Sequence, residues 1–307
     1  MGYIIMEDYV MKRFLRILSL FLLVVSVASC HTKKDFDYSR WYKSDADEDG
    51  RRQMSVLSFN VRYGSAEDDK GDLDWSVRKN AVAAMLTDIH PVLMGCQECE
   101  RAQRADILAA HPEYGVIYTT TGPKEECEEV AIFYLKDSLT VLESGTFYLT
   151  GTPDTPSRLP QSNHYRVCTW GKFKLIRGGQ EFFCFDTHLD THTDAHQTEM
   201  DAILSKIKVL NTDNLPAYLT GDLNTDESST AFTPLKNYGF KSARIEAIVG
   251  DSHKTFNDFG KSSGSTLDHC FFKGFYAVQK FTTVRDTYAG VKYISDHYPI
   301  NIILKFE

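Results

Sequence analysis

From residue 54 onward, the chain alternates short apolar runs with stretches in which apolar residues recur at helical spacing. The short runs have the length of buried strands, and the periodic stretches are typical of helices that pack one face against a sheet. Strand-like runs outnumber helical stretches, yet helical stretches separate them in both halves of the sequence. This order predicts an α/β domain with two packed β-sheets flanked by helices, rather than an all-β sandwich or a doubly wound sheet.

Local patterns give the predicted elements. Helices are expected at residues 77–89, behind Asp74 or Ser76 as caps, at 100–110 and at 200–210. The expected strands are 54–63, 91–95, 129–136, 141–150, 166–176, 181–190, 217–222, 267–272, 282–286 and 300–306. No repeat, low-complexity tract or Gly/Ser/Pro linker interrupts residues 53–307, so we expect one domain there.

Polar residues end several of the apolar runs. Residues that terminate strands can converge at one rim of a packed-sheet domain although they are far apart in sequence. In the segment GDLN, a carboxylate and an amide two residues apart share one face of an extended backbone, where they can meet a metal ion or a phosphate. The junctions that carry such residues are Asn60, Gln97-Glu98, His188 with Asp190, Asp222 with Asn224, and Asp296-His297.

The N-terminal segment predicts export. Met11 is followed by two basic residues, an apolar run over 14–27 and the small-residue sequence that ends at Cys30. This layout resembles a bacterial lipoprotein signal. We therefore expect residues 1–29 to be a signal peptide with its true start at Met11, Cys30 to carry the lipid, and residues 30–52 to form a flexible tether. An uncleaved N-terminal anchor is the alternative.

Composition limits the partners. The formal net charge is −8, and no basic groove is apparent in the sequence, which argues against tight, sequence-independent binding of a long nucleic acid. A rapidly acting nuclease is still compatible with this charge. Among the seven cysteines, Cys96 and Cys99 are expected to be incidental thiols at the end of a buried strand, rather than a redox or zinc motif. Disulfide pairing of the others is left open.

The ordered motifs LSFN, QE, THLD, GDLN, LDH and SDHYP closely resemble those of the endonuclease/exonuclease/phosphatase superfamily. That superfamily includes DNase I-like nucleases, abasic-site endonucleases, inositol polyphosphate phosphatases and neutral sphingomyelinases. A further set resembles a subgroup of secreted bacterial members, namely Trp75, Arg78, Gln103, AIFY at 131–134, TPDTPS at 152–157 and RVCTW at 166–170. The resemblance implies a four-layer α/β/β/α sandwich over residues 53–307 and metal-dependent phosphoester hydrolysis.

The resemblance also implies a metal site. Glu98 matches the carboxylate that holds the divalent cation, Asn60 is the amide beside it, and Asp296 is a second candidate acid. Hard oxygen ligands suit Mg²⁺ or Mn²⁺ better than zinc. Arg166 is a candidate for contacting a non-scissile phosphate of the substrate, with a salt bridge as the alternative.

Five further residues match catalytic positions of the family. Asp222 matches the residue that orients the attacking water, and Asn224 one that donates to a phosphate oxygen or positions Asp222. His297 matches the histidine near the scissile phosphate, and Asp268 the carboxylate that aligns its imidazole. His188 matches the histidine that lies across the phosphate. A phosphoester repels a hydroxide nucleophile, so such a site needs both charge neutralisation and activation of water.

The sequence thus predicts an exported, lipid-anchored, metal-dependent phosphoester hydrolase on the periplasmic or cell-surface side of a bacterial membrane. A phosphodiesterase of nuclease type is the leading prediction, with nucleic acid among the candidate substrates. A phosphatase or sphingomyelinase-like phospholipase acting on sugar, inositol or lipid phosphoesters is the alternative. A non-catalytic surface binding module on the same fold is disfavoured because every catalytic residue type is present. We expect a monomer.

Overall fold

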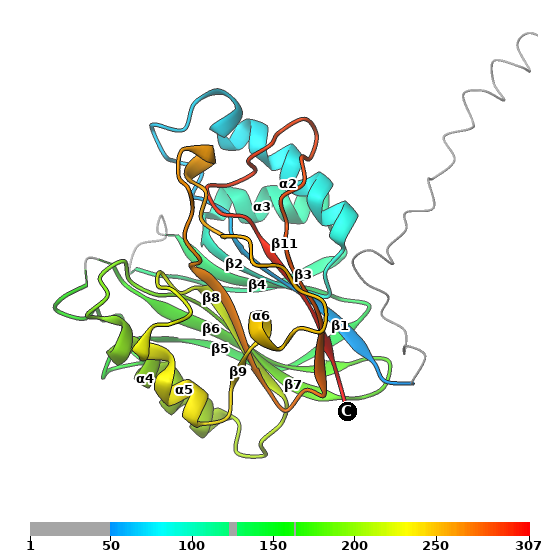
Figure 1. The fold of residues 1–307 in the computed structure, drawn as a ribbon, viewed down its shortest axis with the longest axis vertical. Coiled ribbons are helices and arrows are strands. Elements are labelled where there is room, and N and C mark those ends of the chain that lie inside the picture. Colours follow the sequence, from blue (N-terminus) through cyan, green and yellow to red (C-terminus); the bar gives the residue numbers. More distant parts are fainter. Residues whose placement is uncertain (1–49, 123–127, 163) are drawn as a thin grey trace, which may run out of the picture. The chain divides into compact units, whose positions relative to one another are not determined.

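A computed structural model describes residues 50–122, 128–162 and 164–307. In this part of the chain, the strands form two six-stranded sheets, with helices on their outer faces (Figure 1). The first sheet has the order β11-β12-β1-β2-β4-β3, and the second has the order β5-β6-β7-β8-β10-β9. This is the α/β/β/α sandwich that the sequence predicts.

Both sheets mix parallel and antiparallel pairs, as in β1 with β2 and with β12. The strands of the first sheet are β1 (Gln53–Asn60), β2 (Leu93–Cys99), β3 (Tyr114–Thr120), β4 (Glu129–Leu135), β11 (Ala277–Thr283) and β12 (Ile300–Lys305). Those of the second sheet are β5 (Leu139–Tyr148), β6 (Val167–Leu175), β7 (Glu181–His188), β8 (Ala217–Asp222), β9 (Lys241–Ser242) and β10 (Asp268–Lys273).

The longer helices cover one sheet each. Helices α2 (Trp75–Ile89) and α3 (Arg101–Ala110) lie with the first sheet, and α4 (His196–Leu210) and α5 (Thr233–Asn237) lie with the second (Figure 1). The side chain of Asp74 caps α2 by accepting a hydrogen bond from the Ser76 N–H. The shorter elements are η2 (Gly71–Leu73), η3 (Thr230–Phe232), α6 (Ala243–Glu246) and η4 (Asp258–Gly260).

Alternate residues of strand β7 belong to two different apolar clusters, one on each face of the second sheet. Its Phe182 and Cys184 belong to the apolar cluster that also contains α2 and the first sheet. Its Phe183 and Phe185 belong to a second cluster, which includes residues of α4 and α5. Because successive side chains of a strand point to opposite faces, this unbroken apolar run is explained by burial of both faces of the second sheet.

Most predicted elements are confirmed, with shifted ends. The last predicted strand before β12 was expected at residues 282–286, whereas β11 is Ala277–Thr283, and β3 and β9 were not predicted. The five described cysteines are buried and free, including Cys96 and Cys99. The predicted signal peptide, Cys30 and most of the tether lie outside the described residues. Within residues 50–122, 128–162 and 164–307, no helix is both long and apolar enough to cross a membrane.

Candidate active site

Strand register places three polar side chains at one end of the second sheet. Strand β7 runs parallel to β8 with His188 opposite Asp222, and β10 runs antiparallel to β8 with Asp268 opposite the same Asp222. Gly221 lets the strands approach, because a Cβ atom there would overlap the carbonyl oxygen of Thr187 and its φ is +146°. The three neighbouring strands therefore place two carboxylates and an imidazole together at one end of the second sheet.

The first sheet contributes from the ends of β1 and β2 and from the segment before β12. Asn60 pairs with Gln97 in the register of β1 and β2, so the next residue, Glu98, lies beside Asn60. Glu98 has φ +55°, and the pairing of β2 with β4 shifts register between Cys96 and Cys99. Left-handed backbone at a non-glycine residue is uncommon and is concentrated at functional sites. This irregularity turns the Glu98 carboxylate toward the rim.

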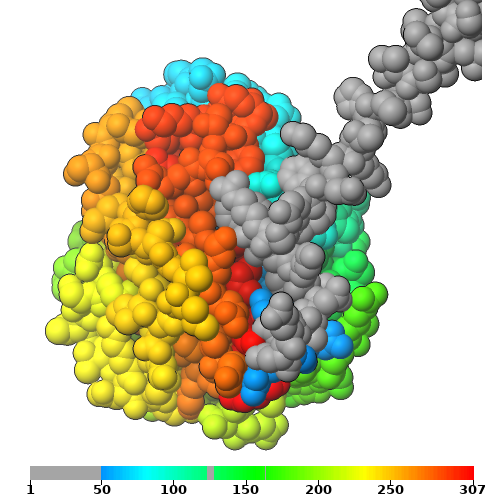
Figure 2. Space-filling view, turned by 45° about the vertical axis from the view of Figure 1, so that its right-hand side comes forward, coloured from blue at the N-terminus to red at the C-terminus, as the bar shows by residue number. Residues whose placement is uncertain are grey.

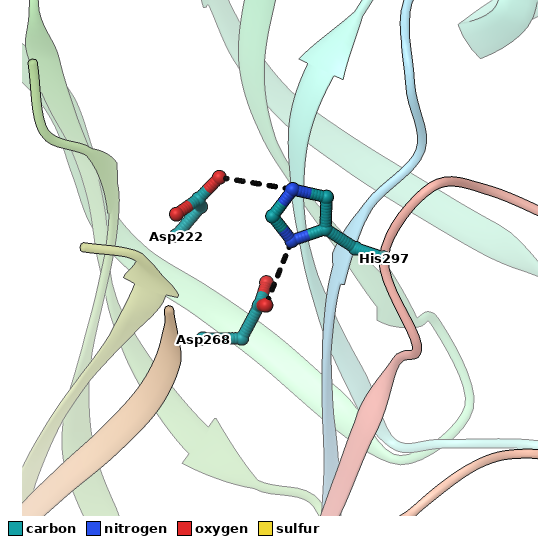
Figure 3. Close-up of side chains that lie close together, drawn as sticks. All are labelled: Asp222, Asp268 and His297. Atoms are coloured by element: carbon teal, nitrogen blue, oxygen red, sulfur yellow. Dashed lines mark hydrogen bonds and ion pairs between the residues drawn. The ribbon is translucent and has the colours of Figure 1, made fainter. Parts of the chain in front are cut away.

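His297 joins two carboxylates of the second sheet (Figure 3). Its Nδ1 lies 2.8 Å from Asp268 Oδ2, and its Nε2 lies 3.6 Å from Asp222 Oδ2. All three side chains are buried, and the ring of Phe256 packs edge-on against the imidazole, with 5.1 Å between ring centroids. The imidazole therefore has a fixed orientation, with one ring nitrogen held by Asp268 and the other facing Asp222.

The same contacts determine the protonation of the pair. Burial alone lowers the pKa of His297, but the negative charges of Asp268 and Asp222 outweigh it and raise that pKa to about 10. Burial raises the pKa of Asp222 to about 6, against the opposing effect of His297. Near neutral pH the imidazole is thus a cation beside a largely ionised carboxylate. The pair combines a hydrogen-bond donor for developing negative charge with a group that can accept a proton from water.

Asn60 links the two sheets at this rim. Its side-chain amide donates to Glu98 Oε1 at 3.0 Å and to Asp222 Oδ2 at 3.0 Å. Its amide oxygen accepts from the backbone N–H of Arg62 at 3.0 Å. In this arrangement Asn60 positions the two carboxylates, and its role as a direct metal ligand stays a prediction.

Asn224 also acts through its neighbours. Its backbone N–H donates to Asp222 Oδ1 at 3.0 Å, and its side-chain amide donates to the carbonyl of Leu189 and to His188 Nε2. Burial, followed by the positive charges of Arg166 and His297, lowers the pKa of His188 well below its usual value. His188 is therefore neutral and accepts at Nε2, so its 3.4 Å approach to Asp222 is not an ion pair.

The carboxylates of Glu98 and Asp296 fit a divalent cation better than the group that contains His297 does. Ligand atoms of Asp222, Asp268 and His297 lie within 4.8 Å of one another, but a protonated imidazole whose Nδ1 is bonded to Asp268 is a poor ligand. In contrast, burial raises the pKa of Asp296 against the opposing charge of His297, and the negative charge of Glu98 adds to the rise, which indicates two carboxylates near each other at the other side of the rim. Hard oxygen ligands in this arrangement suit Mg²⁺ or Mn²⁺.

Arg166 lies deeper than a freely available substrate ligand would. It is buried, and its Nε is 3.8 Å from Asp190 Oδ2. Asp190 also accepts from the hydroxyl of Ser162 and from the backbone N–H of His192 at 2.9 Å. Arg166 therefore forms a salt bridge, which was the alternative prediction, and its contact with a phosphate stays a prediction.

Two residues of the site, Arg62 and Glu128, were missed from the sequence. Arg62, with φ +57°, lies 3.8 Å from Asp296 and bonds Asp69. The pKa of Glu128, next to β4, is raised to about 7 by burial and by the negative charge of Glu98. Neither belongs to a motif. Arg62 follows the end of β1 and Glu128 directly precedes β4, and this proximity to strand ends is the only local signal for them.

A buried arginine holds the loops of the first sheet. Arg78 of α2 donates to the carbonyl oxygens of Val61 at 2.8 Å, Ile294 at 3.1 Å and Arg62 at 3.1 Å. It thereby connects the segment after β1 to the segment before Asp296. The motif residues Arg78 and Gln103, which also donates to Arg62 O, act on the backbone that presents the site.

Comparison with known proteins agrees with this geometry. Residues 57–297 match the model of the endonuclease/exonuclease/phosphatase family. The chain belongs to this family. Enzymes of this family hydrolyse phosphoesters and commonly use divalent metal ions, so the protein is a phosphoester hydrolase.

Three relatives illustrate the similarity. A family protein from Bacteroides thetaiotaomicron is 31% identical, with a TM-score of 0.78 over 84% of this chain and 99% of that structure. A mannosyl-6-phosphatase from Bacteroides thetaiotaomicron VPI-5482 is 31% identical, with a TM-score of 0.77 over 82% and 99% of the two chains. An uncharacterized protein of Acanthamoeba polyphaga mimivirus is 24% identical over 82% of this chain and 100% of its own length.

Proposed function

We propose that this protein is a divalent-metal-dependent hydrolase of sugar phosphoesters, acting with Asp222 and His297 at the reacting phosphate. The observation that supports the chemistry is the buried chain from Asp268 through His297 to Asp222, near the carboxylates of Glu98 and Asp296, whose negative charges influence each other. The sugar preference is supported by the similarity to the mannosyl-6-phosphatase.

The proposed roles follow from the contacts. Asp222, held by Asn60 and by the backbone of Asn224, orients the attacking water and takes its proton. His297, held by Asp268, donates to the phosphate oxygen on which negative charge develops. Glu98 and Asp296 would hold the metal ion, which supplies positive charge to the phosphate.

A nuclease-type phosphodiesterase is the second candidate. Site chemistry of this kind serves diesters as well as monoesters, so the observation against it is electrostatic. Arg62 and Arg166, which lie beside the site, are paired with Asp69 and Asp190, and the whole chain carries a formal charge of −8. A groove for a long polyanion needs unneutralised cations along its length.

Export and attachment to a membrane through a lipid on Cys30 belong to the same proposal. Their support is the sequence of residues 11–30 alone. Mass spectrometry of protein extracted from membranes should find a lipid-modified Cys30 as the first residue. An unmodified Cys30, or an intact segment from Met11, would contradict this part.

A substrate panel tests the proposed reaction. With Mg²⁺ or Mn²⁺, we expect sugar 6-phosphates and p-nitrophenyl phosphate to be hydrolysed faster than bis-p-nitrophenyl phosphate, single-stranded DNA, RNA, inositol phosphates or sphingomyelin. Protein carrying Asp222→Asn, purified in the same way, controls for contaminating phosphatases. Faster cleavage of DNA or of the diester would reject the sugar phosphatase in favour of the nuclease.

A further inference from the structure

A pocket of about 380 Å³ lies next to the catalytic residues, outside the site described above. Its wall is the segment 252–264, which leads toward β10, together with residues from the segment between β11 and β12. These two segments lie side by side on the surface, in orange and orange-red in Figure 2. Its volume is within the range of about 300–1,000 Å³ that is usual for small-molecule sites.

The charge of the pocket is one-sided. Lys254 and Arg285 line it, together with His253, whose Nδ1 accepts from Arg285 at 3.0 Å, and none of the described residues that line it is acidic. The nearby Asp251 is engaged elsewhere, since its carboxylate accepts from the backbone N–H and the hydroxyl of Thr283. In a protein with a net charge of −8, such a cluster favours an anionic ligand.

The remaining lining residues suit a ligand with hydroxyl groups. Tyr293 and Tyr298 contribute rings whose centroids are 6.2 Å apart, and the guanidinium of Arg285 lies 5.5 Å from the Tyr298 ring centroid. Serine hydroxyls complete the lining, including those of Ser252 and Ser263. Aromatic faces with a few convergent donors and acceptors are typical of sites that fix a small polar molecule.

The pocket shares its wall with the catalytic centre. Phe256 lines the pocket, and its ring is the one that packs against His297. The backbone N–H of Asn257, another lining residue, donates to the carbonyl of Asp296 at 2.7 Å. The backbone N–H of Tyr298 donates to Thr255 O at 2.7 Å. Phe256 is therefore a residue that the pocket and the catalytic centre share.

We propose that this pocket is a second binding site, for an anionic sugar unit, and that it holds the part of the substrate beyond the scissile phosphoester. The inference rests on the proposed function for its place in catalysis, but the binding of the sugar does not require turnover. The preferred substrate is then a sugar phosphoester with a second charged sugar unit, such as a phosphorylated oligosaccharide, rather than a single sugar phosphate.

Binding stoichiometry tests the pocket. Calorimetric titration of glucose 6-phosphate into full-length Asp222→Asn protein with Mg²⁺ should show two sites, one catalytic and one in the pocket. When Lys254→Ala and Arg285→Ala are added to this Asp222→Asn protein, the affinity of the second site should fall at least about tenfold, since two charged contacts are removed. Lys261→Ala is the matched control, because Lys261 is exposed in the same segment and does not line the pocket.

Two further arms identify what is recognised. Glucose and inorganic phosphate should each bind the pocket more weakly than glucose 6-phosphate, and equal binding of phosphate would reduce the pocket to a simple anion site and overturn the sugar assignment. A single binding site, or a second site unchanged by the double substitution, would overturn the proposal. The titration is repeated with wild-type protein in EDTA, so that binding is also measured with Asp222 present.

Activity measurements distinguish failure of the pocket from failure of the proposed phosphatase function. The double substitution should leave the hydrolysis of p-nitrophenyl phosphate within about twofold of wild type, because that substrate has no second charged group to place in the pocket. A tenfold loss on this small substrate would mean that the substitutions damage the catalytic centre, and would contradict a separate pocket. If wild-type protein hydrolyses no phosphomonoester but still binds two equivalents of glucose 6-phosphate, the proposed function fails and the pocket stands.

Discussion

The two sheets supply the candidate active site in different ways. The second sheet places His188, Asp222 and Asp268 by regular strand register at buried positions. The first sheet places Glu98 by a left-handed backbone and a shift in pairing, next to a loop that Arg78 holds. Regular register gives fixed distances between groups that exchange protons. Irregular backbone brings like-charged carboxylates face to face, which is tolerable where a cation is to be held.

The comparison leads to a division of labour. Groups whose contacts lie within the buried chain of Asp268, His297 and Asp222 should control the chemical step. Glu98 and Asp296 should control the affinity for metal. Substitutions in these two groups of residues should therefore fail differently.

Asp222→Asn should have the largest effect. The substitution keeps the size of the side chain but removes the group that accepts a proton from water, and general-base catalysis typically contributes about 10²–10⁴-fold. We expect kcat to fall by about that factor on the best substrate of the panel, with the fold intact by circular dichroism. A loss of less than about threefold would remove Asp222 from the role of base.

His297→Ala should follow. The imidazole is held as a cation by Asp268 and Asp222, and removal of one donor to a developing oxyanion costs on the order of 10²–10³ in kcat. The measurement is steady-state kinetics with saturating Mg²⁺. An increase in KM with an unchanged kcat would instead indicate that His297 serves only to bind the substrate.

Asp268→Asn should give a milder version of the same defect, on the order of tenfold in kcat, because the imidazole survives without its orienting carboxylate. The diagnostic readout is the titration of His297 followed by NMR. Its pKa should drop in the variant, since the negative charge that raises it is lost. An unchanged pKa of His297 would show that Asp268 does not act through the imidazole.

The smallest effect on catalysis is expected away from the rim, at a residue that affects stability alone. Glu199 of α4 accepts from the backbone N–H of Asp190 at 3.0 Å, and burial raises its pKa from 4.5 to about 7. Between these values the unfolded chain releases a proton that the folded protein keeps, so stability falls as pH rises from about 4.5 to about 7. Glu199→Gln should abolish this loss, on the order of 3 kcal/mol, without changing kcat.

Urea unfolding at several pH values checks this expectation. The variant should gain stability relative to wild type as pH rises through that interval and remain level above it. Asp201→Asn, an exposed acid on the same helix, provides the control and should follow wild type. A parallel pH dependence of Glu199→Gln and wild type would show that Glu199 ionises normally in the folded protein.

The division between the sheets also explains what the sequence could predict. Strand β7 is buried on both faces, so its apolar run was visible, and His188 at its end was found. Strand β3 has mostly half-buried residues, and β11 contains the polar pair Gln279 and Lys280 at a pairing irregularity, so neither gave a clear pattern. Local alternation reports burial, and these strands are only partly buried.

The residues of the candidate site also differ in how far the sequence could predict them. Asp222 and Asn224 could be predicted as a pair because their spacing puts them on one face of a strand end and because other strand ends carry polar residues too. The contact of Asp268 with His297, which are 29 residues apart, came only from the family resemblance. Arg62 and Glu128 could not be predicted, because their places depend on a left-handed residue and on the packing of β4 beside Glu98. Backbone irregularities of this kind leave no periodic trace in the sequence.

A metal titration tests the central claim most directly. Activity of wild type, Glu98→Gln and His297→Ala is measured against Mg²⁺ and Mn²⁺ concentration on one substrate. Glu98→Gln removes a charge that faces Asp296, so it should need at least about tenfold more metal for half-maximal activity and should be partly rescued at high metal. His297→Ala should keep the wild-type metal midpoint and stay slow at every concentration. Equal rescue of both variants, or an unshifted midpoint for Glu98→Gln, would contradict the division of labour between the metal-binding carboxylates and the buried chain of Asp268, His297 and Asp222.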